Sequence, residues 1–124
     1  MDKDVKMKSN QKLFDLSNKV IVLTGSAGRL GTNFAHILAD AGADLVLIDI
    51  DKKQNEKLEK SILTKFKTKI LCSNVDITEK DQLEILSKQI LKKFKKIDGL
   101  VNNAFYSPRT NIKKSAMKFE DFEL

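Results

Sequence analysis

A glycine-rich segment, Thr24–Gly31 with the sequence TGSAGRLG, has residue types and a spacing that suit phosphate binding. It follows the apolar run Val20–Leu23 and precedes an amphipathic stretch, so we expect it to connect a strand to a helix. Such a turn presents free backbone N–H groups at the positive end of a helix, which favours a diphosphate. Gly25 would make the tight turn, Gly28 would let the backbone approach the phosphates, and Gly31 would let the helix pack closely on the sheet.

Three further residues of this turn are candidate binding residues, namely Ser26, Arg29 and Leu30. Arg29 could contact a phosphate, and a solvated arginine is the alternative. A glycine-rich turn is weak evidence when it stands alone, because loops and close packing also use glycine. The interpretation therefore depends on the residues C-terminal to the turn.

An acidic residue stands where a dinucleotide site requires one. Asp49 ends a second apolar run, 18 positions after Gly31. A carboxylate at this place can accept hydrogen bonds from both hydroxyls of the adenosine ribose and would repel a 2′-phosphate, which favours NAD over NADP. Lys52 and Lys53 lie close enough to weaken that preference. The alternative is that Asp49 caps the helix that begins with KKQNEKLEK.

The elements that must position these residues alternate between two periodicities. Apolar runs predict strands at 19–24, 44–49, 69–76 and 97–103. Apolar residues at helical spacing predict three helices, one between each pair of successive strands. The apolar faces of these helices contain residues 30, 34, 37, 38 and 41, then 58, 62 and 66, and then 83, 86, 90 and 94. Gly42 suits the left-handed end of the first helix, and Thr78 carries a start signal for the third. A loop containing Pro108 and the start of another helix at 117–124 complete the chain.

This alternation predicts an α/β fold. Strands that are apolar throughout are typical of parallel strands covered on both faces. Right-handed crossovers then give a doubly wound, Rossmann-type sheet of about four strands in the order 3-2-1-4. We expect residues 1–12 to be a loose N-terminal segment and 13–124 to form a dinucleotide-binding half-domain that is incomplete at its C-terminus, with the edge of its fourth strand exposed.

Composition narrows the class of protein. At 124 residues the chain forms one domain at most. Its net charge of +6 comes from lysines spread along the chain, with two arginines and few aromatic residues, so a solvated surface is favoured over a nucleic-acid partner. No stretch approaches the about 20 apolar residues that span a bilayer, and the charged start does not resemble a secretion signal. The lone Cys72 excludes an internal disulfide and favours the cytoplasm, and its apolar surroundings favour a buried side chain over a reactive thiol.

Four motifs occur along the chain in the order that is typical of the short-chain dehydrogenase/reductase family: TGSAGRLG, the acidic Asp49, VDIT and LVNNAF. Together they resemble that family over nearly the whole chain. The glycine spacing T-G-x-x-G-x-x-G is more typical of the family's extended, sugar-nucleotide-modifying members. VDIT resembles the segment in which an Asp, here Asp76, contacts the adenine and the next residue, Ile77, lies along it. The resemblance therefore extends the predicted site beyond the first two strands.

The segment LVNNAF resembles the family's N-N-A-G motif. The resemblance implies that Asn103 and Ala104 line the cofactor while Asn102 mainly braces the sheet, and Phe105 stands where the family has glycine. NNAFYSPRT together with the later KFEDFE is also similar to a bacterial branch associated with flagellin modification and nine-carbon acid sugars.

The family's proton-transfer groups are a Tyr with a Lys four residues later, a Ser and an upstream Asn. The one tyrosine here, Tyr106, has Thr110 at that spacing, and Ser107 and Ser115 lie too early for the Ser role. The resemblance implies that the tetrad lies beyond Leu124, so no catalytic residue is assigned. His36 has no metal-ligand set near it in the sequence, and a surface histidine is expected.

The sequence thus predicts the cofactor-binding fragment of an NAD(P)-dependent oxidoreductase that acts on an alcohol or ketone, a small molecule of sugar-derived type. The completed protein is expected to form a homo-oligomer, and the fragment to be inactive and poorly stable alone or to associate through its exposed strand edge. A non-catalytic NAD-binding or regulatory module is one alternative. A fragment of a nucleotide-sugar epimerase or dehydratase, suggested by the glycine spacing, is another.

Overall fold

The computed structural model describes residues 13–105 and contains one four-stranded sheet. The segment 1–12, the loop containing Pro108 and the helix predicted at 117–124 lie outside the described residues. The strand order is β3-β2-β1-β4 and all pairings are parallel, which confirms the predicted order. The strands are β1 (Val20–Thr24), β2 (Asp44–Ile48), β3 (Ile70–Ser73) and β4 (Gly99–Val101), and the helices are α2 (Arg29–Asp40), α3 (Lys52–Lys65) and α4 (Lys80–Phe94).

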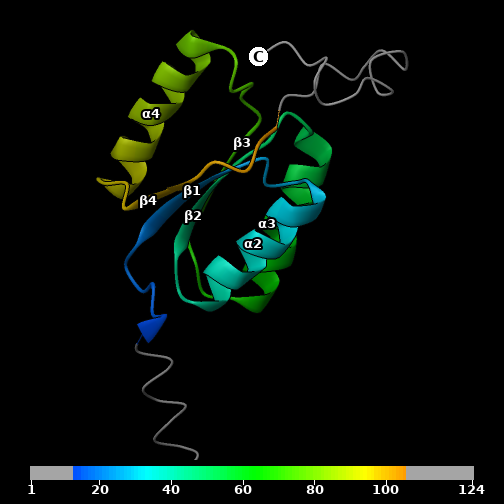
Figure 1. Cartoon of the computed structure of the whole chain (residues 1–124). Coiled ribbons are helices and arrows are strands. Elements are labelled where there is room, and N and C mark those ends of the chain that lie inside the picture. Colours follow the sequence, from blue (N-terminus) through cyan, green and yellow to red (C-terminus); the bar gives the residue numbers. More distant parts are fainter. Residues whose placement is uncertain (1–12, 106–124) are drawn as a thin grey trace, which may run out of the picture.

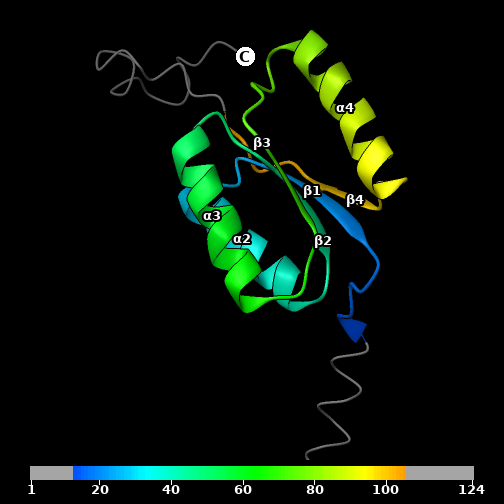
Figure 2. The same cartoon turned by 180° about the vertical axis from the view of Figure 1, so that it is seen from behind.

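The helices cover both faces of the sheet. Figures 1 and 2 show α2 and α3 packed on one face and α4 on the other. Each strand of the central pair therefore buries both faces, and β1 is buried at all five positions. The pairing runs from Val20 opposite Asp44 to Thr24 opposite Ile48, so the carboxyl ends of both strands lie at the same edge. The turns that lead into α2 and α3 meet at this edge.

The buried face of α2 differs from the prediction. Gly31, Ala35 and Ala39 are buried. Leu30 and Ile37, for which the sequence predicts burial, are 61% and 65% exposed. Small residues at four-residue spacing let the helix approach the sheet closely, which leaves Leu30 and Ile37 pointing outward, while Leu38 of the predicted stripe packs against the core. Helical periodicity alone does not distinguish these two faces of α2.

The predicted stripes of the other two helices face the core. Leu58 and Ile62 of α3 and Leu86 and Ile90 of α4 are buried, and the remaining members Phe66, Leu83 and Phe94 are half-buried. Of the helices that the structure describes, none is long and apolar enough to cross a membrane.

One helix start departs from the sequence prediction, and the alternative role of Asp49 as a helix cap is excluded. Gly42 has φ of +97° after the end of α2, as expected. The N-cap of α3 is Asp51, whose side chain accepts from the Gln54 N–H, so Asp49 is not the cap. The N-cap of α4 is Glu79 rather than Thr78, because the Thr78 hydroxyl donates instead to the Asp76 carboxylate at 2.7 Å.

Candidate functional site

The turn between β1 and α2 is attached to the carboxyl end of β2. The N–H of Ser26 donates to the carbonyl oxygen of Ile48 at 3.2 Å, and the N–H of Ala27 donates to the Asp49 carboxylate at 2.9 Å. Within the turn, the N–H of Gly28 donates to the carbonyl oxygen of Gly25 at 3.3 Å. These bonds hold the glycine-rich turn against the residue that the sequence assigned to a ribose.

The three glycines of the turn are needed for different reasons. Gly25 has φ of +65°, and a Cβ there would lie 2.8 Å from the Cα of Ala104. A Cβ on Gly31 would lie 2.0 Å from the carbonyl oxygen of Gly25, so this residue allows the helix to pack on the turn. Gly28 is exposed, and a Cβ there would meet its nearest atom at 3.4 Å, an ordinary contact. Because the protein's own packing does not require glycine at this position, Gly28 fits a place where a ligand approaches the backbone.

The start of α2 has the character of an anion site. The first turn of any helix leaves backbone N–H groups without intrahelical partners. Gly28 is the N-cap, and no side-chain bond caps the helix within the described part of the chain. The first turn carries no acidic residue and begins with Arg29, so no neighbouring side-chain charge in that turn opposes an anion.

Asp49 is held in place by two backbone N–H groups. One carboxylate oxygen accepts from Ala27 at 2.9 Å, and the other accepts from Asp51 at 2.9 Å. An ionised carboxylate offers about four lone-pair sites, so each oxygen can still accept one hydroxyl. The side chain is half-buried beside the turn and available to a diol.

A cleft of about 560 Å³ opens at the carboxyl edge of the sheet. We call it the carboxyl-edge cleft. Its lining includes every residue that the sequence assigned to the site except Ser26 and Gly31. Ser26 is fully buried beneath the turn, and Gly31 packs against the turn from the helix side. The lining residues are Gly25, Gly28, Arg29, Leu30, Ile48, Asp49, Ile50, Val75, Asp76, Ile77, Thr78, Asn103, Ala104 and Phe105.

The segment after β4 is tied to the glycine-rich turn. The hydroxyl oxygen of Thr24 accepts from the N–H groups of Asn103 and Ala104 at 3.1 and 3.0 Å. The side-chain amide of Asn103 donates to the carbonyl oxygen of Gly25 at 3.1 Å. The side chain of Asn103 therefore braces the turn, and Asn102 is exposed. Sequence reasoning also missed Thr24, although a hydroxyl directly before the first glycine is a visible signal.

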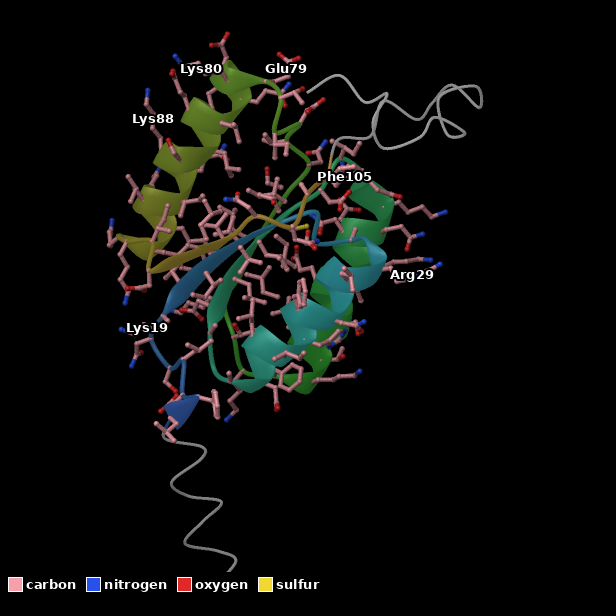
Figure 3. The ribbon with its side chains drawn as sticks, viewed as in Figure 1. Lys19, Arg29, Glu79, Lys80, Lys88 and Phe105 are labelled. Carbon is pink, nitrogen blue, oxygen red and sulfur yellow. The ribbon has the colours of Figure 1, made fainter. Side chains whose placement is uncertain are left out.

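An aromatic residue, Phe105, follows shortly after Asn103 at the carboxyl edge of the sheet. Phe105 is 83% exposed at the mouth of the cleft. Figure 3 shows Phe105 and Arg29 at the end of the sheet opposite to Lys19. An exposed aromatic ring at this place offers a flat apolar wall to whatever occupies the cleft.

The far side of the cleft combines a carboxylate with two apolar side chains. Asp76 accepts from the N–H and the hydroxyl of Thr78, and these hydrogen bonds hold the pKa of its carboxyl below the usual value. Ile77 and Ile50 are 36% and 72% exposed and both line the cleft. Ile50 was not predicted from the sequence, although an isoleucine between two aspartates in a polar turn is a visible signal. Exposed isoleucines with a neighbouring acceptor suit a heteroaromatic ring that carries an amino group.

Other polar features do not add chemistry to this site. Burial raises the pKa of the Cys72 thiol to about 12, and Glu59 adds to the effect, so the thiol stays protonated at neutral pH. The His36 ring packs edge-on against Phe66, with 6.4 Å between centroids. Among the described residues 13–105, no group of His, Cys, Asp or Glu is arranged to hold a metal ion.

Known proteins match the part of the chain that contains the sheet and the carboxyl-edge cleft. The family model described as short chain dehydrogenase matches residues 19–123. The post-translational flagellin modification protein A of Campylobacter coli is 31% identical over 90 residues, covering 73% of this chain and 35% of that protein. The NAD-dependent glycerol dehydrogenase of Listeria innocua is 36% identical over 97 residues, covering 78% of this chain and 37% of that protein.

Solved structures agree with the sequence relatives. NAD⁺-bound xylitol dehydrogenase superposes with a TM-score of 0.70 at 31% identity, covering 73% of this chain and 35% of that one. The L-sorbose reductase of Gluconobacter frateurii, complexed with NADPH and L-sorbose, gives a TM-score of 0.72 at 28% identity, covering 83% and 39%. This chain therefore spans about 35% of the length of the curated relatives that it matches.

Proposed function

Because this chain belongs to the short-chain dehydrogenase family, we propose that it is the coenzyme-binding part of an NAD(P)-dependent oxidoreductase that interconverts an alcohol and a ketone. The observation that carries the proposal is the convergence at one cleft of an open glycine position, Gly28, and a carboxylate, Asp49, held against the same turn. The nicotinamide coenzyme, when bound, supplies or accepts the hydride. The chain's own residues bind and orient it.

The proposed placement is based on the chemistry of the cleft. Backbone N–H groups at the start of α2, together with Arg29, would bind the diphosphate. Asp49 would accept from the ribose hydroxyls, and Ile50 and Ile77 would flank the adenine with Asp76 as an acceptor for its amino group. Asn103, Ala104 and Phe105 would then lie toward the nicotinamide end.

We propose NAD rather than NADP as the coenzyme. The carboxylate of Asp49 would repel a 2′-phosphate, and its two backbone donors keep it in place beside the turn. The relatives support only the broader assignment, since one solved structure contains NAD⁺ and another contains NADPH.

The substrate proposed for the whole protein is a polyhydroxylated, sugar-derived alcohol or ketone. The names of three relatives, which refer to glycerol, xylitol and L-sorbose, support this class. A role in flagellin modification is a narrower version of the proposal, supported by the Campylobacter relative at 31% identity.

A second candidate is a non-catalytic NAD-binding module, because the open Gly28 position and the Asp49 carboxylate would bind the coenzyme in the same way in such a module. The gene sequence after codon 124 distinguishes the candidates. A downstream Tyr-x-x-x-Lys in frame supports the oxidoreductase, and a stop codon supports the module.

Fluorescence titration of the chain with NADH and NADPH tests the proposal. We expect saturable binding of NADH, weaker binding of NADPH, and a loss of NADH affinity of ~1–3 kcal/mol in Asp49→Ala, because a charge-assisted bond to the ribose is removed. Asp51→Ala is the matched control, since it removes a neighbouring carboxylate that caps α3 without facing the ribose. Equal or tighter NADPH binding by the wild-type chain would refute the NAD preference, and no binding of either coenzyme would refute the function.

A further inference from the structure

A buried asparagine connects the glycine-rich turn to strands β2 and β3. Asn55 lies in the first turn of α3 and its side chain is fully buried. Its oxygen accepts from the Ser26 hydroxyl at 2.7 Å. Its amide nitrogen donates to the carbonyl oxygens of Leu47 in β2 and Ser73 in β3, both at 3.1 Å.

The partners fix the orientation of the Asn55 amide. Two carbonyl oxygens can only accept, so the nitrogen must face them and the oxygen must face the Ser26 hydroxyl. The Ser26 hydroxyl is therefore the donor in its bond to Asn55. Both side chains are fully buried, so neither has water as an alternative partner, and breaking their bond would leave a desolvated acceptor.

The same network reaches the carboxylate side of the site. The carbonyl oxygen of Ser73 accepts from the N–H of Asp49 at 3.1 Å as well as from Asn55. Ser26 is the buried side chain of the turn, and its own N–H is bonded to Ile48. Asn55 is thus bonded on one side to the turn and on the other to the carbonyl group that holds the backbone of Asp49.

From these contacts we infer that Ser26 and Asn55 form a positioning pair that sets the distance between the diphosphate turn and the ribose carboxylate. This inference rests on the proposed binding of a dinucleotide. Neither side chain lines the carboxyl-edge cleft, so the pair acts through the backbone of the turn and of Asp49 rather than by touching the ligand. The pair therefore affects the affinity of ligands that contact both the turn and the Asp49 carboxylate.

Ser26→Ala isolates the link to the turn. The substitution removes the hydroxyl but leaves both bonds from Asn55 to the strands. We expect the affinity for ADP, which spans the turn and the ribose site, to fall at least fivefold, while the affinity for adenosine, which engages Asp49 without the turn, changes less than twofold. A purely structural role would weaken both ligands equally or neither.

Ser73→Ala is the matched control, because it makes the same chemical change on β3 and keeps the carbonyl oxygen that accepts from Asn55 and Asp49. It should leave both affinities within twofold of wild type. Circular dichroism and isothermal titration on the full chain, with ADP and adenosine as ligands, give the fold and the affinities. Wild-type chain that binds neither ADP nor NADH would refute the proposed function and this inference with it. Wild-type binding with an unchanged ratio of ADP to adenosine affinity in Ser26→Ala would refute the positioning pair alone.

Discussion

Replacing Gly28 with alanine should weaken coenzyme binding without destabilising the fold. Gly28 has φ of −74°, which alanine adopts freely, and the added Cβ would lie 3.4 Å from the carbonyl oxygen of Gly25. In contrast, a Cβ on Gly31 would lie 2.0 Å from the same oxygen and 2.8 Å from the Cα of Ser26. The fold therefore accommodates the first substitution and must deform for the second.

These distances set the expected magnitudes. Alanine is a poorer N-cap than glycine by ~0.5–1 kcal/mol. Alanine also lowers the conformational entropy of the unfolded chain, which stabilises the folded state by ~0.4–1 kcal/mol and offsets the loss at the N-cap. Gly28→Ala should therefore change the free energy of unfolding by less than about 1 kcal/mol. A methyl group at the phosphate approach should remove at least one charge-assisted hydrogen bond of ~1.5–3 kcal/mol, which weakens NADH about tenfold or more. Gly31→Ala should destabilise the fold by ~1–3 kcal/mol or more, because the turn must move.

Urea unfolding and NADH fluorescence titration of the two variants measure these quantities. We expect Gly28→Ala to keep the stability of the wild-type chain and to lose affinity for NADH. If Gly28→Ala bound NADH as tightly as wild type, the turn would not be the diphosphate site. If it unfolded like Gly31→Ala, the geometric argument for an open position would be wrong.

Three further predictions concern the residues around the site. Asp98 accepts from the Val20 N–H, which holds its pKa below 3.8, so its stabilising contribution is present above pH 4 and is lost as the pH falls through the lowered value. Asp98→Asn should lose less stability than wild type between pH 6 and pH 3 in urea unfolding, and an equal loss would contradict the assignment. Thr24→Val should lower the free energy of unfolding by ~1–3 kcal/mol because the N–H of Ala104 loses its acceptor, whereas Thr24→Ser should not; a Val variant as stable as wild type would count against this. Cys72 should react with a thiol reagent at pH 8 far more slowly in the native chain than in urea, and equal rates would overturn the protonated thiol.

The sheet was predictable because its signals are local. Apolar runs flanked by amphipathic stretches specify parallel strands, and the right-handed crossover rule leaves the order 3-2-1-4. The carboxyl edge then collects the ends of β1, β2, β3 and β4, so residues far apart in sequence, such as Gly28, Asp49 and Asn103, line one cleft. Sequence order and strand ends were sufficient for this part.

Close packing and competing hydrogen bonds could not be predicted in the same way. The stripe of Leu30, Phe34 and Ile37 on α2 looked like a core face, but the alanines opposite allow a closer approach to the sheet. Which acceptor caps a helix depends on which other donors reach it. Asp49 is occupied by the Ala27 N–H, which leaves the capping role to Asp51.

The burial of Asn55 is a third feature that could not be predicted from the sequence. A polar residue in a lysine- and glutamate-rich helix gave no sign of burial, yet its side chain is fully buried. Its partners Ser26, Leu47 and Ser73 lie on three different elements, so only the assembled fold brings them within hydrogen-bond distance. Long-range polar networks of this kind carry no periodic signal in the sequence.

Amide chemical-shift mapping of the nitrogen-15-labelled chain with NAD⁺ shows where on the molecule the coenzyme binds. We expect the largest shifts on the N–H groups of residues 25–31, 49–50, 76–78 and 103–105, which surround the carboxyl-edge cleft. Shifts that instead cluster at the opposite end of the sheet, near Lys19 and Gly42, would contradict this binding site. A folded chain whose spectrum does not change with NAD⁺ would contradict it as well.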